Sequence, residues 1–331
     1  MSTGPVLLDG ATATELQRHG VPVRAPWWTS QALRTPRGRL VLGRIHAAYR
    51  AAGAQVLTAN TFRCNLRTLS RAGLDPVAAG RLVEVAVGLA GAAARPGSVA
   101  WAGSMTEGGS AAGTDPGVGS GSGAGHAVGP VWVAGSIAPV EDCYRPDLVP
   151  DLAELRTEHG WLARRLARAG VDVLLVETMN CVREARVALD AALRTGRPVW
   201  VSFVVTGGAR LLSGEPLGAA ARAVSGDGAA AVLVNCAAPV PLAEGLRALR
   251  AVPVPVIGGY PNLERRTGAA ARGHVDRWVP AGLAPAAFAD LAARWTAEFH
   301  PDLLGACCGS QPAHLAALAA RLGTSHSAVM E

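Results

Sequence analysis

The sequence predicts a (β/α)8 barrel, an α/β fold, that occupies residues 1–331 as a single domain. Short apolar runs rich in valine and leucine alternate with longer stretches in which alanine, leucine and arginine recur at helical spacing. Strands that alternate with helices connect through right-handed crossovers and form a parallel sheet. Near-continuous apolar strands indicate that both faces of this sheet are buried. Eight such units favour the barrel, which typically takes about 250 residues and grows by insertion.

The expected strands are short and end in polar or glycine-containing turns. They span residues 5–12, 54–62, 130–139, 171–179, 198–205, 230–239, 254–262 and 303–309. Helical patterns lie between most of them, and the clearest are at 35–53, 151–170 and 181–196. Residues 106–129 interrupt this alternation because they are rich in glycine and serine. We expect them to form a flexible surface loop, inserted before the third strand.

Polar and cysteine side chains stand at the carboxyl ends of these strands or directly after them. They are Asp9, Asn60, Glu177, Cys236 and the adjacent pair Cys307 and Cys308. In a barrel, the carboxyl ends of all strands meet at one mouth, where the active sites of such enzymes lie. In an open doubly wound sheet, which is the structural alternative, only residues near the reversal of strand order would meet. These positions therefore favour the barrel and place a functional site at its mouth.

Composition and charge argue against several classes of function. The formal net charge is +6, and the basic residues other than histidine are all arginines, which form no continuous stripe that would bind nucleic acid. No segment reaches the ~18 to 20 apolar residues of a membrane span, and the N-terminal residues lack a secretory signal pattern. We therefore expect a cytoplasmic protein that binds neither nucleic acid nor membrane, with its six cysteines reduced.

Reduced cysteines favour metal binding or catalysis over a disulfide framework. Three of them are expected to act as small buried apolar residues, namely Cys64, Cys143 and Cys181. Cys236 and the pair Cys307 and Cys308 differ, because the sixth and eighth strands of a barrel lie one strand apart and both end at the mouth. Neighbouring residues in a strand point to opposite faces. We therefore expect a turn between Gly305 and Gly309, in which both sulfurs face one ion.

Three thiolates at the mouth would fill three positions of a tetrahedral Zn²⁺ and leave the fourth open, as in catalytic zinc sites. Zinc deprotonates a coordinating thiol, whereas a free thiol with a pKa of about 8.5 is only a few per cent thiolate at neutral pH. The predicted chemistry is attack by a metal-bound thiolate on an electrophilic carbon. His314 is expected to face outward or to cap a turn. The alternative from another class is a non-catalytic zinc or redox protein, with a closed site or a vicinal Cys307–Cys308 disulfide.

Motifs along nearly the whole chain resemble those of the homocysteine S-methyltransferase family. In order they are "LLDGATATELQRHG", "LTANTF", "VAGSIAPVEDCY", "LLVETMNCVREA", "LLSGEPL", "VNCAAP", "GGYPN" and "GACCGSQPAHLAAL". Each motif alone is weak, but the ordered set that ends in a cysteine pair is specific. The resemblance implies a zinc-dependent (β/α)8 barrel that methylates the sulfur of homocysteine and gives methionine.

The resemblance also implies roles for individual residues. The implied zinc ligands are Cys236, Cys307 and Cys308. Asp9 and Glu177 would hold the amino group of homocysteine, since two carboxylates give charge-assisted hydrogen bonds to an ammonium. Main-chain amides at the Gly10 turn would receive the substrate carboxylate, and Asn60 is expected to line the pocket. Taken alone, Asp9 could instead be a helix N-cap and Glu177 a salt-bridged strand end.

Two departures from the family pattern leave the acceptor open. The family commonly has glycine where this chain has Ala13 and Ala138. Extra methyl groups there could reshape the pocket, so the same chemistry on another small thiol or a selenol is an alternative. The nearby segment "EDCYRPD" offers four side chains close to a donor site: Glu141, Asp142, Tyr144 and Asp147. For these, a charged surface turn is the favoured interpretation.

The expected methyl donor is a sulfonium compound, S-methylmethionine or S-adenosylmethionine. The sequence continues only briefly beyond the cysteine pair, which leaves no room for folate, cobalamin or activation domains, and small members of the family resemble the sulfonium users. A cationic donor also suits an anionic zinc-thiolate centre, because attack neutralises charges of both signs in a low-dielectric pocket. The expected partners are therefore a small thiol, homocysteine first, and a sulfonium donor.

Overall fold

Eight parallel strands form the central sheet of the protein. The computed structural model describes residues 4–95, 131–264 and 281–323, so the segment 106–129 lies outside the described residues. The strands are β1 (Val6–Leu7), β2 (Val56–Ala59), β3 (Trp132–Ile137), β4 (Val173–Met179), β5 (Val199–Phe203), β8 (Ala231–Asn235), β9 (Ile257–Tyr260) and β10 (Leu303–Leu304). Their order in the sheet is β1-β10-β9-β8-β5-β4-β3-β2. Each strand falls within a segment predicted from the sequence.

The sheet closes into a barrel where β1 meets β2. A parallel bridge joins Leu8 to Val56, and main-chain hydrogen bonds flank it from Asp9 to Val56 and from Gln55 to Leu7. Side chains complete this seam: the Gln55 Oε1 atom accepts a hydrogen bond from the Leu7 amide, and the Asp9 carboxylate accepts one from the Thr58 amide. The predicted (β/α)8 barrel is confirmed.

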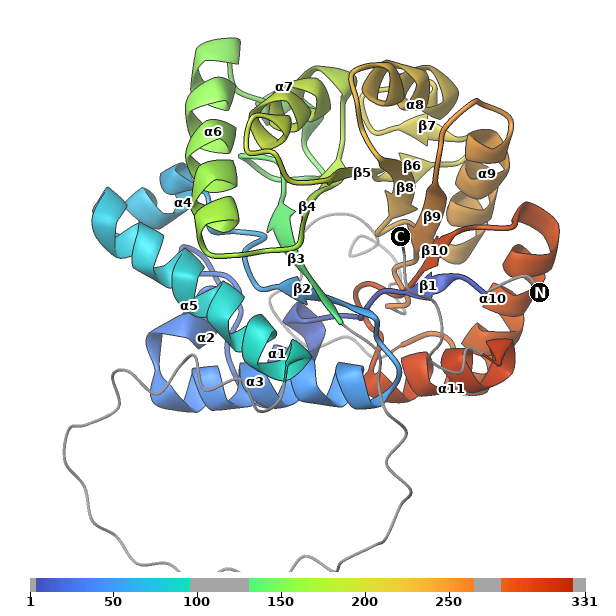
Figure 1. Cartoon of the computed structure of the whole chain (residues 1–331), viewed down its shortest axis with the longest axis horizontal. Coiled ribbons are helices and arrows are strands. Elements are labelled where there is room, and N and C mark those ends of the chain that lie inside the picture. The colour runs from blue at the N-terminus through green and yellow to red at the C-terminus, as the bar shows by residue number, and fades with distance from the viewer. Residues whose placement is uncertain (1–3, 96–130, 265–280, 324–331) are drawn as a thin grey trace, which may run out of the picture.

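Helices cover the outside of the strand ring (Figure 1). They are α1 (Ala13–Arg18), α2 (Gln31–Arg34), α3 (Pro36–Ala51), α4 (Leu66–Arg71), α5 (Pro76–Ala94), α6 (Leu152–Arg168), α7 (Val182–Leu193), α8 (Leu217–Gly226), α9 (Pro239–Arg250), α10 (Pro285–Phe299) and α11 (Pro312–Leu322), with a 3-10 turn at Pro146–Leu148. Several begin at a side chain whose oxygen accepts a main-chain hydrogen bond of the first turn: Thr35, Asn65, Asp75 and Asp151. Such caps each contribute about 1 kcal/mol.

Apolar side chains fill two layers, as alternating strand residues require. Inside the ring lie residues such as Leu8, Leu175, Trp200 and Leu233. Trp200 stacks on Trp132, with ring centroids 6.2 Å apart. The larger layer lies between the strands and the helices. The lumen is therefore a packed core, and a ligand has room only at an end of the barrel.

Helix α5 corrects one expectation about membranes. Among the described residues, α5 is the one helix that is long and apolar enough to cross a membrane by length and composition. From the sequence, no segment of this kind was expected. The helix is rich in alanine and glycine, and residues such as Val83 and Val87 are buried in the outer core layer. Its composition is thus explained by packing against the barrel.

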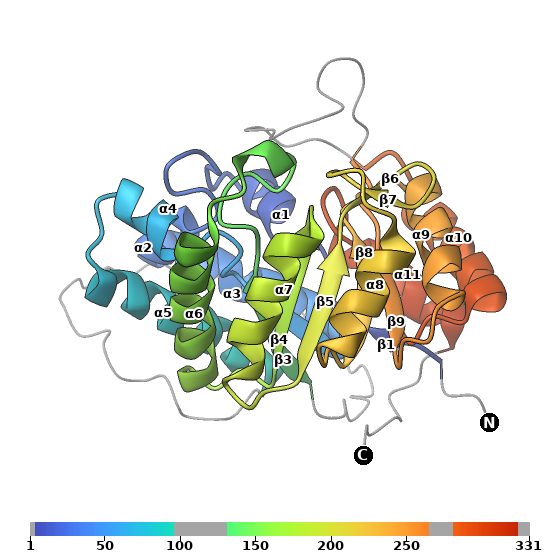
Figure 2. The same cartoon turned by 90° about the horizontal axis from the view of Figure 1, so that it is seen from above.

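The strands run toward the edge of the barrel where the short hairpin of β6 (Val205–Thr206) and β7 (Arg210–Leu211) lies (Figure 2). This hairpin follows β5 directly. It therefore marks the carboxyl-end mouth, the side on which barrels of this kind hold their sites.

Candidate functional site

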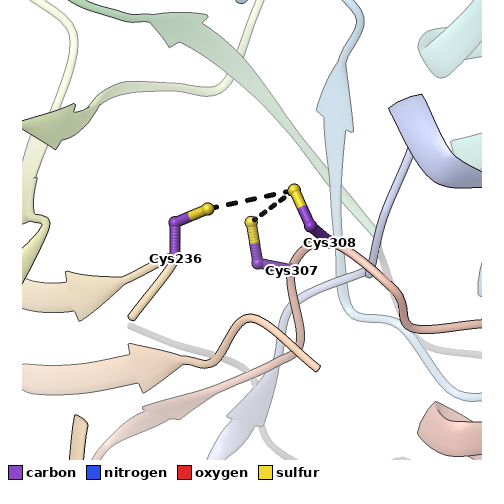
Figure 3. Close-up of side chains that lie close together, drawn as sticks. All are labelled: Cys236, Cys307 and Cys308. Carbon is purple, nitrogen blue, oxygen red and sulfur yellow. Dashed lines mark hydrogen bonds between the residues drawn. The ribbon is translucent and has the colours of Figure 1, made fainter. Parts of the chain in front are cut away.

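Three cysteine sulfurs converge at the mouth. Cys236 directly follows β8, while Cys307 and Cys308 form part of the turn after β10. The Sγ atoms of Cys236 and Cys308 lie 3.9 Å apart, as do those of Cys307 and Cys308, and all three lie within 4.8 Å of one another (Figure 3). Three sulfurs in this arrangement could hold a zinc ion and leave a position open, because zinc accepts thiolate ligands in tetrahedral sites.

The turn after β10 explains how adjacent cysteines face one point. The strand ends at Leu304, directly before the segment from Gly305 to Gly309 in which a turn was expected. The Ser310 amide donates to the Cys307 carbonyl, and Gly309 has a φ of +82°. A Cβ at Gly309 would lie 2.6 Å from the Glu264 nitrogen, so only glycine fits there. The turn removes the alternation of strand side chains.

The chain continuing from β9 holds this turn in place. The Cys307 amide donates to the Pro261 carbonyl at 2.8 Å, and the Leu263 amide donates to the Cys308 carbonyl at 2.7 Å. Directly after β8, Cys236 has a φ of +51°, which is unusual for a residue with a side chain. Both halves of the cluster are therefore fixed by the main chain.

The thiols resist ionisation when no cation is near. Hydrogen bonding with Cys236 and burial raise the pKa of Cys307 and of Cys308 well above the usual value for a thiol. Three thiolates packed together would repel one another, and a bound cation would remove that repulsion. The cluster is thus suited to a metal ion rather than to a free nucleophilic cysteine.

Two buried carboxylates share the cavity with the sulfurs. Asp9 is 4% and Glu177 7% exposed. The Asp9 carboxylate accepts hydrogen bonds from the Thr58 amide at 2.8 Å and the Thr58 hydroxyl at 2.9 Å. Glu177 accepts from the Ser136 hydroxyl at 2.5 Å and the Tyr260 hydroxyl at 3.0 Å. Asp9 is not a helix N-cap, since Thr12 occupies that position of α1. Within the described ranges, Glu177 accepts its hydrogen bonds from two hydroxyl groups rather than from a basic side chain.

Burial raises the pKa of both carboxyl groups. The pKa of Asp9 rises from 3.8 to about 7, and that of Glu177 from 4.5 to about 7, in each case mainly by desolvation. Hydroxyl and amide donors offset only part of this effect. A ligand ammonium placed between them would supply the missing positive charge and favour the ionised forms.

Gly10 and Asn60 also line the cavity. A Cβ on Gly10 would lie 2.6 Å from the Ser310 Oγ atom and 2.7 Å from the Tyr49 hydroxyl, so a larger residue there would have to displace these side chains. The Asn60 amide nitrogen donates to the Thr29 carbonyl at 3.0 Å. Asn60 therefore holds the wall segment at Thr29 while it borders the pocket.

The cavity that contains these groups has a volume of about 190 Å³ and is open to solvent. Of the two alanine departures, Ala13 lines it and Ala138 does not, although Ala138 is buried. Cys143 also borders the cavity, whereas Cys64 and Cys181 do not, and all three are buried and free.

Tyr144 belongs to the segment that the sequence offered near a donor site, although a charged surface turn was the favoured interpretation. Its hydroxyl lies 3.3 Å from the Cys236 sulfur, and both Asp142 and Tyr144 line the cavity. The interpretation as a charged surface turn holds for Asp147, which pairs with Arg145, but is wrong for Tyr144. The sequence signal for Tyr144 was its place in the polar segment "EDCYRPD" after the third strand of the barrel.

Histidine does not complete the cluster as a fourth ligand among the described residues. The His314 Nδ1 atom accepts a hydrogen bond from the Gln311 amide, and its Nε2 atom lies 3.0 Å from the Leu283 carbonyl. His314 thus caps the start of α11, as expected, although it is buried rather than outward-facing.

A closed (β/α)8 barrel that gathers three cysteines and two carboxylates at its mouth defines a barrel enzyme with a candidate sulfur-ligand metal centre. The chain belongs to the homocysteine S-methyltransferase family, because the model of that family matches residues 6–322. The predicted family and enzyme class are confirmed, which leaves a non-catalytic zinc or redox protein without support.

Individual relatives agree with this assignment. A homocysteine S-methyltransferase of Escherichia coli (strain K12) is 28% identical over 327 residues, which cover 96% of this chain and 94% of the relative. A selenocysteine Se-methyltransferase of Brassica oleracea var. italica is 24% identical over 339 residues, covering 98% and 90%. The crystal structure of the homocysteine methyltransferase MmuM from Escherichia coli in its metallated form matches with a TM-score of 0.73, at 24% identity, covering 96% of each chain. The last comparison supports the fold.

Proposed function

We propose that this protein transfers a methyl group from a sulfonium donor, S-methylmethionine or S-adenosylmethionine, to the sulfur of homocysteine and so forms methionine. The observation that carries the proposal is the convergence of three cysteine sulfurs with Asp9 and Glu177 in one cavity. A site for homocysteine needs a place for its sulfur and a place for its amino group. These two sets of residues supply both.

The chain's own residues would bind and orient the acceptor. Asp9 and Glu177 would hold the ammonium group through charge-assisted hydrogen bonds, and amides at the Gly10 turn would receive the carboxylate. Asn60 would border the acceptor, as it lines the cavity. Held at one end, the substrate would extend its thiol toward Cys236, Cys307 and Cys308.

The cysteine cluster fits a zinc ion, since it offers three soft donors. Among the described residues, no histidine joins these donors as a fourth ligand, so one position is left for the substrate. Zinc held there would keep the substrate sulfur as a thiolate. The transfer then forms a bond between that sulfur and the methyl carbon. The bond from the methyl carbon to the donor sulfur breaks, and its electron pair stays on the donor, which leaves as a neutral thioether. Alignment of the two sulfurs with the methyl carbon is the main further contribution of the protein.

A cationic donor fits the charge of the pocket. Thiolates and two carboxylates make the mouth anionic once they are ionised, and a sulfonium would be attracted to it in a low-dielectric environment. We place the reaction in the cytoplasm, where the cysteines stay reduced.

A methylation assay tests the proposal directly. Zinc-loaded protein is incubated with homocysteine and either S-methylmethionine or S-adenosylmethionine, and methionine is measured. We expect turnover with at least one donor and none without homocysteine. Absence of turnover with both donors, in protein shown to contain zinc, would refute it.

A selenol is a second candidate acceptor. It is favoured by the similarity to a selenocysteine Se-methyltransferase and by the extra methyl group of Ala13 in the cavity wall. The same assay with selenocysteine in place of homocysteine compares the two acceptors. A higher kcat/KM for selenocysteine would make the selenol the preferred substrate.

A further inference from the structure

Arg63 places a guanidinium group in the wall of the same cavity. It follows β2 by four residues and lines the pocket together with Phe62 and Trp28. The guanidinium carbon lies 5.4 Å from the centre of the Phe62 ring and 5.5 Å from that of Trp28. Its Nη1 atom donates a hydrogen bond of 2.7 Å to the Glu141 carbonyl. Arg63 is therefore held in position, half-buried, by an aromatic wall and a main-chain oxygen.

Among the residues that the structure describes, the guanidinium of Arg63 lacks the carboxylate partner that the nearby arginines have. Arg67 and Arg71 both pair with the Glu141 carboxylate, at 2.6 and 2.8 Å. No carboxylate lies within 4.0 Å of the Arg63 guanidinium in the part of the chain that the structure describes. A planar guanidinium presents several N–H donors in the geometry that suits a carboxylate. The pocket thus contains a guanidinium group that is suited to bind an anionic group of a ligand.

The loop after β3 connects this cation to the sulfur cluster. Glu141, whose carbonyl binds Arg63, lies three residues before Tyr144, whose hydroxyl lies 3.3 Å from the Cys236 sulfur. Three residues span at most about 11 Å between α-carbons. Asp142 lies between them and also lines the cavity. Asp142 directly follows Glu141, whose carbonyl holds the Arg63 guanidinium, and both Arg63 and Asp142 line the cavity. Opposite charges therefore lie close together, beside the place where methyl transfer would occur.

We propose that Arg63 binds the carboxylate of the methyl donor, which makes it a specificity-determining residue for a sulfonium that is also an amino acid. Asp142 lies beside it to receive the donor's ammonium group. This inference rests on the proposed function. We assign the acceptor to Asp9 and Glu177 because these carboxylates are almost fully buried, whereas Arg63 is only partly buried and therefore lies nearer to solvent.

The proposal gives Arg63 opposite effects on two kinds of donor. A donor with a carboxylate gains a charge-assisted hydrogen bond from the guanidinium. A simple sulfonium that lacks a carboxylate meets only repulsion between like charges. Arg63 would therefore select the zwitterionic donor by attraction and reject the simple cation by repulsion.

Kinetics with two donors test this. Zinc-loaded wild-type protein and Arg63→Gln are compared with S-methylmethionine and with trimethylsulfonium, each with homocysteine. Loss of a hydrogen bond between charged groups should raise the KM for S-methylmethionine by about tenfold or more, with the KM for homocysteine unchanged. The kcat/KM with trimethylsulfonium should stay the same or rise. An equal fall with both donors would overturn the proposal in favour of a structural role, and a rise in the homocysteine KM alone would assign Arg63 to the acceptor.

A matched control is Arg34→Gln. Arg34 also lies over a tryptophan, 3.8 Å from the Trp27 ring centre, but it does not line the cavity. We expect no change in the KM for either donor. An equal effect in Arg34→Gln would show that loss of any arginine in this region is sufficient and would overturn the assignment.

A binding measurement distinguishes failure of this inference from failure of the proposed function. S-Methylmethionine is titrated into zinc-loaded protein without homocysteine, and tryptophan fluorescence reports its binding. Binding to wild type that is weakened in Arg63→Gln supports the donor site even if no turnover occurs, in which case only the proposed reaction fails. Equal binding to both proteins, or to neither, overturns the role of Arg63.

Discussion

Asn235 and Thr178 exchange two hydrogen bonds across the width of β5, the strand that lies between β8 and β4. The Thr178 amide donates to the Asn235 Oδ1 atom at 3.1 Å, and the Asn235 Nδ2 atom donates to the Thr178 hydroxyl at 2.7 Å. Ser202 on β5 donates to the same Oδ1 atom at 2.8 Å. Because Asn235 precedes Cys236 and Thr178 follows Glu177, these bonds fix a candidate metal ligand relative to a candidate substrate ligand.

Replacement of Asn235 by alanine should therefore weaken both zinc binding and homocysteine binding. Thr178 has a φ of +58°, a strained conformation for a β-branched residue, and it would lose both partners. We expect the free energy of unfolding to fall by about 1 to 3 kcal/mol, and zinc affinity and homocysteine affinity to fall together. Urea denaturation and zinc titration measure these effects. In Ser202→Ala, which keeps the pair intact, the losses should be smaller; equal losses in both variants would contradict this role of Asn235.

Removal of one cluster sulfur should remove the metal. Cys308→Ser replaces a soft donor by a poor zinc ligand, so we expect zinc content well below one ion per chain and loss of methyl transfer. The control is Cys181→Ser, since Cys181 is buried outside the cavity. Metal analysis of both purified proteins decides the outcome. A full zinc content in Cys308→Ser would show that the cluster is not the metal site.

The stability of the metal-free protein should depend on the ionisation of Asp9. Burial raises the pKa of Asp9 in the folded state to about 7, above its unfolded value of 3.8. The contribution of this group is therefore fully present below about pH 4 and is lost as the pH rises through about 7. Asp9→Asn should remove this dependence, because asparagine is neutral at every pH and can keep hydrogen bonds to Thr58. Denaturation of both proteins at several pH values measures the difference, which should favour the variant increasingly as pH rises; a constant difference would contradict the shift.

Gly10→Ala should destabilise the protein through a steric clash. The new Cβ would lie 2.6 Å from the Ser310 Oγ atom and 2.7 Å from the Tyr49 hydroxyl, and Tyr49 is buried. Overpacking of this kind costs about 1 to 3 kcal/mol. Gly226→Ala is the matched control, since Gly226 ends helix α8 and a Cβ there meets nothing within 4 Å. Thermal unfolding should show a lower melting temperature for Gly10→Ala alone.

The sequence was sufficient to predict the order of the strands and the groups at their carboxyl ends. Periodicity reports burial, and in a closed parallel barrel burial and strand polarity together determine which residues share the mouth. The sequence therefore indicated that Cys236, Cys307 and Cys308 meet, although the first and the second lie 71 positions apart in the chain. The structure places their sulfurs within one cluster.

Residues whose role depends on loop paths could not be predicted in this way. Tyr144 reaches Cys236 only because the loop after β3 folds back over the mouth, and Arg63 borders the cavity because the Glu141 carbonyl holds it. Asn235 looked like one polar residue in an apolar strand, and its partner Thr178 lies two strands away. Periodicity carries no signal for such contacts, because they depend on the three-dimensional course of individual loops and side chains.

The seam between β1 and β2 limits how this enzyme could change its substrate. Only one bridge joins these strands in the described ladder, and Asp9 contributes its carboxylate to the same wall through Thr58. If Asp9 binds the amino group of the acceptor as proposed, a mutation that altered this recognition would also weaken closure of the barrel. Evolution toward a new acceptor would therefore proceed more readily at Ala13 or Arg63, which line the cavity without joining two strands. On this proposal, the stability of the barrel constrains changes of substrate at Asp9, whereas changes at Ala13 and Arg63 are free of that constraint.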